Sequence, residues 1–366
     1  MANIKFSAFT QKLNQADVDF LVGYKSATNE NVRIAPSNLS SVTSLNDLSD
    51  VIVDNTDANA YFIEIPASRS GDLGNLGIGV DALEDLTSGK YNVAIGADAL
   101  NSLTTSQYAT AIGYNAGAAA GTTLMGGATL IGHRAGFGRS GFRNVAVGDS
   151  PMSFGSGKTN VNKNTAIGYH TLYRIDTNGE NNIAIGHEAS QFLTTAIENI
   201  AIGDNAARNS TANGHISIGH QSGYSQTSGS NNTNIGYQAG YDNTTQSDRT
   251  IIGYEAGEHS TGAACTFIGL GAGKGSAGTS IGAYNTAIGK EAGLAITSGT
   301  QNVLAGSSAG DSITTGTNNI VIGYEADASS ATVSNEITFG DANITALRIP
   351  GLQSGASDGD VLTFSS

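Results

Sequence analysis

The chain has 366 residues, of which 49 are glycine, 13% are charged and 7% are aromatic, with no tryptophan. Large core side chains are therefore scarce, which argues against a conventional enzyme built around a thick core. The formal net charge of −14 argues against nucleic-acid binding, because an acidic surface repels phosphate backbones. Cys265 is the single cysteine, so we expect neither disulfides nor a cysteine metal cluster, as in a reducing cytoplasm.

Residues 1–44 lack the internal repeat that fills most of the chain. Their opening has no apolar signal-peptide core, and no stretch of the sequence reaches the ~18 apolar residues of a membrane span, so we expect no membrane partner. VDFLVGYK (18–25) and NVRIA (31–35), on either side of a polar segment, predict a strand–turn–strand unit. Within 45–74, DVIVDN and AYFIEIP predict two more short strands in a neck before the repeats.

Residues 75–343 repeat one short phrase, for example NVAIG (92–96), NTAIG (164–168) and NIVIG (319–323). Each copy closes on a glycine, at Gly79, Gly96, Gly113, Gly132, Gly148, Gly168, Gly186, Gly203, Gly219, Gly236, Gly253, Gly269, Gly289, Gly306, Gly323 and Gly340. Fifteen steps cover the 261 residues from the first of these glycines to the last, a mean of 17.4 residues. Such a period predicts an all-β parallel roll, or solenoid, of about 16 coils of ~17 residues, each with two short strands and two turns.

The residues before each glycine form columns along the repeat. β-Branched residues occupy the positions three and one before the glycine, and a small residue, often alanine, lies between them. This alternation predicts a short strand with two different faces. We expect the Ile and Val face to fill each coil and the Ala face to lie outside. The columns include Ile95, Ile112, Ile167, Ile185 and Ile202 on one face and Ala94, Ala166 and Ala184 on the other.

Two further columns concern the turns. The glycine after each strand indicates a positive φ or a close approach of backbone. Asparagine precedes the strand in ten copies, where its side chain is suited to bonding turn backbone. These residues are Asn75, Asn92, Asn144, Asn164, Asn182, Asn199, Asn232, Asn285, Asn302 and Asn319. A coil this narrow buries little surface, so we expect the Ala faces of several chains to meet, with a homotrimer as the natural closed assembly.

The phrase N-[TVI]-A-I-G followed by Y-x-A-G, as in GYQAG (236–240) and GYEAG (253–257), resembles the repeats of cyanophage-type bacteriophage tail fibres. More distantly it is similar to the β-roll heads of trimeric autotransporter adhesins. The resemblance implies a trimeric fibre in the virion, assembled in the host cytoplasm and serving host attachment. An autotransporter would need a signal peptide and a C-terminal membrane barrel, and we recognise neither in the sequence. We therefore prefer the phage interpretation.

The same resemblance assigns roles to the two ends of the chain. Residues 1–44 would attach to tail, baseplate or other virion proteins, because the opening is similar to the start of such fibres. NITALRIPG resembles the segment that closes such repeats, so residues 344–366 would form a small cap or a connector. A fibre or decoration protein of the capsid or neck is an alternative location for the same structure.

Patterns that imitate catalytic sites fall on the repeat columns. GSSAG (306–310) matches the nucleophile motif of hydrolases, and GLGAGKGS (269–276) resembles a phosphate-binding loop, but Lys274 is followed by glycine. The histidines of one column belong to coils that are not all adjacent. The sequence therefore predicts no catalytic residue, no metal and no cofactor. A tailspike-type enzyme with paired carboxylates is the less favoured alternative, because the loops between repeats are short.

The column directly after the glycine is the one candidate for ligand contact. Tyrosines repeated along a fibre would stack on host-surface sugars, and many weak contacts would add up. The competing interpretation is that each ring only covers its neighbour. A receptor-binding or glycan-binding adhesin head is therefore the alternative to a passive shaft. The tyrosines are Tyr114, Tyr169, Tyr237, Tyr254 and Tyr324.

Overall fold

The computed structural model describes residues 21–25, 30–34, 74–118, 125–138, 141–153, 160–278 and 281–347. The chain divides into two units, Met1–Ile65 and Pro66–Ser366. In the first unit, β1 (Leu21–Lys25) and β2 (Glu30–Ile34) pair in antiparallel fashion, which confirms the two strands expected there, while the turn predicted between them lies outside the described residues. The strands predicted at DVIVDN and AYFIEIP, and nearly all of the predicted C-terminal cap, lie outside the described residues.

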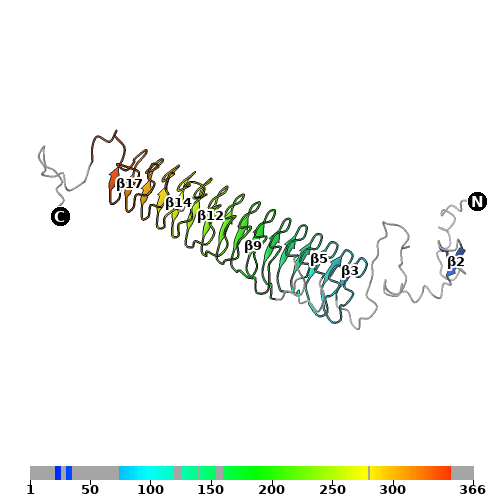
Figure 1. The fold of residues 1–366 in the computed structure, drawn as a ribbon. Helices are drawn as coiled ribbons and strands as arrows, with labels where there is room; N and C mark the ends of the chain where they lie inside the picture. Colours follow the sequence, from blue (N-terminus) through cyan, green and yellow to red (C-terminus); the bar gives the residue numbers. More distant parts are fainter. Residues whose placement is uncertain are drawn as a thin grey trace, which may run out of the picture. The chain divides into compact units, whose positions relative to one another are not determined.

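The second unit contains one parallel sheet of sixteen strands in chain order, in which each strand pairs with its neighbours along the chain and the first and last strands form the edges (Figure 1). About fifteen turns of a roll connect these strands. The predicted all-β parallel roll is thus confirmed, and the described ranges contain no helix that is long and apolar enough to cross a bilayer. The strands are β3 (Leu76–Ile78), β4 (Val93–Ile95), β5 (Thr110–Ile112), β6 (Thr129–Ile131), β7 (Val145–Val147), β8 (Thr165–Ile167), β9 (Ile183–Ile185), β10 (Ile200–Ile202), β11 (Ile216–Ile218), β12 (Thr233–Ile235), β13 (Thr250–Ile252), β14 (Thr266–Ile268), β15 (Thr286–Ile288), β16 (Val303–Ala305), β17 (Ile320–Ile322) and β18 (Ile337–Phe339).

Each coil has one strand, and the prediction of two strands per coil is wrong. The side of the coil opposite the strand is a turn in which left-handed residues alternate with ordinary ones, such as Asp98 (φ 57°) and Leu100 (φ 50°). The Asp98 amide donates to the carbonyl of Val80 in the preceding coil, and the Leu100 amide donates to Ala116 in the following coil. The turns therefore bond from coil to coil without an extended backbone.

The expected orientation of the two strand faces is reversed. The central strand residues Ala94, Ala166 and Ala184 are 0% exposed and point into the coil, whereas Ile112 and Ile167 point outward and are each 37% exposed. The interior between strand and turn is narrow, so the central position of the strand usually holds a small side chain. The larger β-branched residues therefore form the outer surface, and the Ala column does not face other chains.

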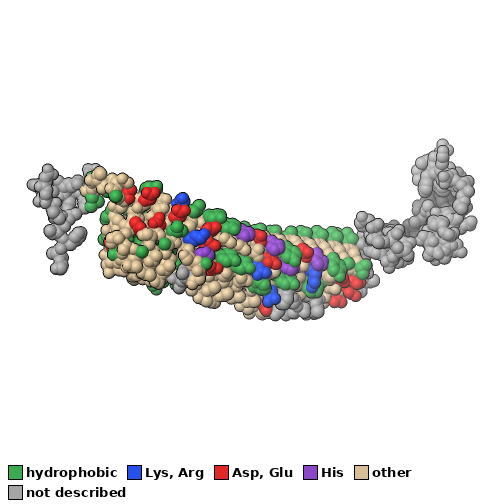
Figure 2. Space-filling view, turned by 45° about the horizontal axis from the view of Figure 1, so that its top comes forward, with side chains coloured by type: hydrophobic (Ala, Val, Ile, Leu, Met, Phe, Trp, Pro, Cys, Tyr) green, Lys and Arg blue, Asp and Glu red, His purple; other side chains and the backbone are tan. Residues whose placement is uncertain are grey.

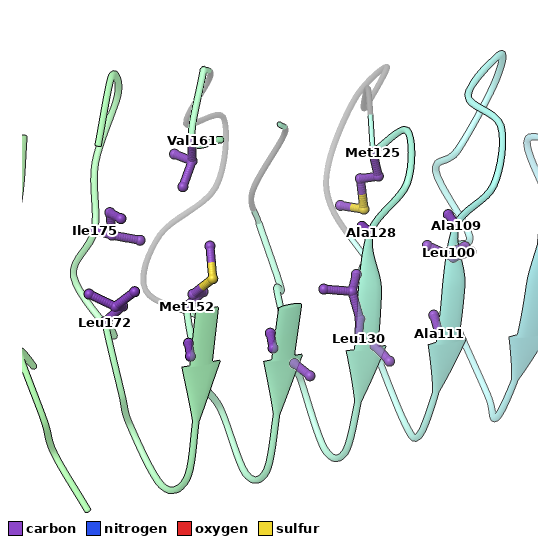
Figure 3. Packing of buried hydrophobic residues seen from close by; sticks show 14 of the residues in the cluster. Leu100, Ala109, Ala111, Met125, Ala128, Leu130, Met152, Val161, Leu172 and Ile175 are labelled. Atoms are coloured by element: carbon purple, nitrogen blue, oxygen red, sulfur yellow. The ribbon is translucent and has the colours of Figure 1, made fainter. Parts of the chain in front are cut away.

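The volume inside a coil is shared between the central strand residue and the residue six positions later in the turn. Alanine at 166 is followed by Leu172, which is fully buried (Figure 3). Leu130 is instead followed by Gly136, where an added Cβ would lie 2.8 Å from the Leu130 side chain. Large residues at one position are thus matched by small residues at the other, as close packing requires.

The glycine after each strand is needed for two reasons, as the sequence predicts. Gly186 has φ +135°, a conformation that side chains disfavour, and an added Cβ would lie 2.4 Å from the carbonyl oxygen of Gly203. The corresponding glycines of neighbouring coils lie against one another in the same way. The coils therefore stack closely because their corners carry no side chain.

The asparagine column is a buried ladder that ties the coils together. The Asn182 side chain accepts hydrogen bonds from the backbone and side-chain amides of Asn199 at 3.1 and 3.0 Å. Its own amide donates to Asn164 Oδ1 in the preceding coil and to the carbonyl of Ala196. This confirms the expectation that stacked asparagines satisfy the polar groups of the turns.

Candidate interaction surfaces

The outward side of the sheet is a continuous face free of charge, which we call the outer β face. It consists of the first and third residues of β3 to β18, and it contains only Ile, Val, Leu, Phe, Ala and Thr. The parallel register places like residues side by side, so that Ile185 lies beside Ile202. Several members are well exposed, including Ile112, Ile131, Ile167, Ile183, Ile288, Ile322, Ile337 and Phe339.

The size of the outer β face is comparable with that of protein interfaces. Three residues of strand span ~10 Å, and fifteen steps of ~4.8 Å span ~72 Å, which gives a face of roughly 700 Å². Monomeric proteins rarely expose larger apolar patches, and a standard interface buries about 800 Å² on each partner. Seven of its thirty-two residues are threonine, so this face is uncharged and mostly apolar, and its extent is similar to that of one side of a standard interface.

The structure places the five predicted tyrosines in one exposed column beside the glycines, which we call the aromatic column. Their exposed fractions range from 39% at Tyr237 to 66% at Tyr324. Tyr237 stacks on Tyr254 with ring centroids 5.0 Å apart, and Tyr169 stacks on His187 at 5.2 Å. The rings thus cover one another along the roll while their edges remain accessible, and ligand contact there stays a prediction.

Histidine and aspartate alternate with the tyrosines in part of the aromatic column. Figure 2 shows histidine and acidic side chains close together along one face of the roll. His133 Nδ1 lies 2.8 Å from Asp149 Oδ1, and the hydrogen bond from His133 lowers the pKa of the Asp149 carboxyl. His187 and Asp204 form a similar pair at 3.2 Å. These side chains are about half exposed, so each pair adds little to stability. Within the described ranges, no group of three such residues is placed to hold a metal ion.

A groove of about 480 Å³ lies beside Tyr108, outside the aromatic column, at the end of a second and shorter stack of tyrosines. Tyr91 and Tyr108 stack at 5.4 Å, but the next coil has Gly127 at the equivalent position. The groove is lined by Tyr108, Gly126, Gly127, Phe142, Arg143, Asn162, Lys163 and Glu180. The groove was not predicted from the sequence, although Gly126 and Gly127, which interrupt the column of Tyr91 and Tyr108 in a coil of 19 residues, were a usable signal.

The patterns that imitate catalytic motifs are ordinary coil turns. Ser308 of GSSAG has φ 55° and occupies the same left-handed position as Asn115 in another coil. Lys274 of the phosphate-loop imitation contacts the carboxylates of Glu255 and Glu258, and the Glu255 hydrogen bond raises the Lys274 pKa. Its charge is therefore engaged by neighbouring acids within the roll.

No protein-family model, curated protein or solved structure matches the chain.

Proposed function

We propose that this chain is the structural protein of a fibre, in which the rolls of three copies lie parallel and cover one another's outer β faces. The observation that supports this most is the outer β face itself, which is uncharged and extends over all sixteen strands. A second copy is the partner of matching period, since each copy repeats the same step of ~4.8 Å. Parallel association keeps that match over the full length of the roll.

The proposed fibre belongs to a phage virion and serves in host attachment, with residues 1–44 as its attachment region. The support is the likeness of the N-[TVI]-A-I-G phrases to phage tail-fibre repeats. Antibodies raised against residues 75–343 test this by electron microscopy of virions. Label on projecting tail fibres is the expected result, label on the capsid or neck moves the fibre there, and unlabelled virions contradict the proposal.

The association itself is tested by charging the outer β face. Ile185→Lys combined with Ile202→Lys places two like charges on adjacent strands of that face, where a covered surface excludes water. We expect this variant to lose the assembly while circular dichroism still reports β structure. The matched control is Thr195→Lys combined with Ser228→Lys, at two exposed loop positions. Unchanged assembly of the Ile variant would contradict the proposed interface.

A glycan-binding role is the second candidate, and the exposed stacked rings of the aromatic column favour it. Sugar rings pack against aromatic faces and edges, and a fibre multiplies weak contacts. Tyr237→Ala combined with Tyr254→Ala should then reduce binding of the purified protein to host cells. Tyr91→Ala combined with Tyr108→Ala is the control, because it removes another exposed stacked pair outside the column. Equal binding of both variants to host cells would contradict glycan contact by the aromatic column.

A further inference from the structure

The apolar interior of the roll is interrupted by buried polar side chains over four consecutive coils. One hydrophobic cluster ends at Ala207 and the next begins at Ala239. Around this break, polar residues stand where other coils point leucine, isoleucine or alanine inward, and His215 and Arg249 replace asparagines of the buried ladder. We call this set the polar block: Ser210, His215, Ser217, Gln226, Asn234, Asn243, Arg249 and Ser260.

Arg249 is the most unusual member of the polar block. It occupies the asparagine column, between Asn232 and Cys265, and only 1% of it is exposed. None of its guanidinium nitrogens, Nε, Nη1 or Nη2, has a hydrogen-bond partner among the described residues. A buried cation without hydrogen bonds or an opposite charge is strongly disfavoured. The fold therefore places a charge where the protein supplies nothing to compensate it.

The neighbours of Arg249 do not neutralise it. Cys265 is the one titratable group whose charge acts on it, but burial raises the pKa of this thiol, which is therefore protonated at neutral pH. The Cys265 Sγ–H points at the carbonyls of Ala263 and Gly282. Burial lowers the pKa of Arg249 only to about 10, so the guanidinium keeps its charge at pH 7.

Other members of the polar block leave further buried polar atoms unused. Asn234 Nδ2 and Oδ1, Asn243 Oδ1 and Ser260 Oγ have no hydrogen-bond partner among the described residues. Asn243 and Ser260 stand at the inward loop position of two adjacent coils, where other coils carry leucine or isoleucine. A neutral water would satisfy such donors and acceptors, but it would leave the charge of Arg249 without a counter-ion.

We propose that the polar block holds a small monovalent anion of the halide class against the guanidinium group of Arg249. The guanidinium supplies the positive charge and several N–H donors, and Asn234 Nδ2, on the adjacent strand, is a further buried donor without a partner among the described residues. An enclosed interior favours an ion with a single charge and a small radius. The ion would enter as the coils close, so binding stabilises the folded chain and not the unfolded one.

The test compares thermal unfolding of the full chain refolded in sodium chloride, sodium bromide or sodium gluconate at equal ionic strength. Gluconate is too large for an interior position. We expect the wild-type chain to melt several degrees higher in either halide than in gluconate. An equal melting temperature in all three salts would overturn the proposal.

Two arginine variants separate this site from general salt effects. Arg249→Asn removes the charge and extends the asparagine ladder from Asn232. The difference in melting temperature between halide and gluconate, the halide-specific shift, should therefore disappear in this variant. Arg208→Asn removes an arginine outside the polar block, whose Nε lies 2.8 Å from a carboxylate oxygen of Glu188, and this variant should keep the shift. A shift retained in Arg249→Asn would overturn the proposal.

Diffraction from wild-type crystals grown in bromide provides a measurement that does not depend on any variant folding. An anomalous peak within hydrogen-bond distance of the Arg249 nitrogens is the expected result. A guanidinium group that contacts only protein atoms or water in those crystals would refute the anion site.

Discussion

At Ala166 and Leu172 the strand and the turn of one coil meet across its interior, and the two side chains divide one small volume. Both residues are fully buried. The pair formed by Leu130 and Gly136 divides the same volume the other way, with the large side chain on the strand. Packing inside a coil is therefore decided by pairs six residues apart, and a change at one member is felt at the other.

Ala166→Leu should destabilise the roll by about 1–3 kcal/mol, because the added carbons have no space opposite Leu172. Adding Leu172→Gly should recover most of that loss, since it recreates the arrangement of Leu130 and Gly136 and places glycine at a left-handed position (φ 46° at Leu172). Denaturant unfolding of the two variants measures both effects. A single variant as stable as the wild type would show that the coil interior is not filled.

His215 couples the stability of the roll to pH. Burial lowers its pKa from 6.5 to about 4, and its Nδ1 accepts a hydrogen bond from the Asn232 amide at 3.3 Å. The folded chain therefore keeps the ring neutral between these values, whereas the unfolded chain binds a proton below about pH 6.5. The stability contributed by the neutral ring is present above pH 6.5 and is lost as the pH falls towards 4.

His215→Asn should flatten the fall in unfolding free energy between pH 7 and pH 5 relative to the wild type. His187→Asn, at a half-exposed histidine outside the coil interior, is the matched control. Denaturant midpoints at several pH values measure the slopes. Identical slopes for the wild type and His215→Asn would contradict the burial of a neutral ring.

At the scale of the coil, the strand, the glycine corner and the asparagine ladder were all predictable, because each is a column with a constant position in the repeat. The direction of the strand faces was not. A period of two distinguishes two faces but does not say which is inside, and the narrow coil selects alanine for the interior. The size exchange between Leu130 and Gly136, or between Ala166 and Leu172, was visible in the sequence and would have corrected the orientation.

The polar block and the groove were not predicted from the columns of the repeat. Arg249 interrupts a column whose usual member is asparagine, but an interruption alone does not show that the side chain stays buried. The groove lies where Gly126 and Gly127 supply no side chain next to Tyr108 and Phe142. Both features follow from three-dimensional placement and not from the period of the repeat.

Two glycine substitutions separate the cost of close backbone contact between coils from the cost of a positive φ. Gly186→Ala should cost about 3 kcal/mol or more, because its Cβ would meet the Gly203 carbonyl in addition to the positive φ. Gly278→Ala is the matched change and should cost about 1–2 kcal/mol, since Gly278 has φ +76° but no atom of the described residues lies within 4 Å of an added Cβ. Thermal or denaturant unfolding measures both, and equal losses would mean that corner contact does not limit coil stacking.

At the scale of the whole molecule, the reversed strand faces change the account of assembly. The alanines fill the coil, so they are not available to other chains, and the isoleucines that were expected inside form the outer β face. Self-association through this face buries it without any new backbone arrangement, because neighbouring strands already present like residues in register. The proposed fibre therefore rests on a surface of large apolar side chains and not on small ones.

The native mass of the purified protein, determined by light scattering after size exclusion, tests this account most directly. The chain has a mass of 37.1 kDa, so a homotrimer has three times that mass and should elute early as an elongated particle. A trimeric mass is the predicted result. A stable monomer of 37.1 kDa would mean that the outer β face stays open to water, and it would contradict the proposed fibre.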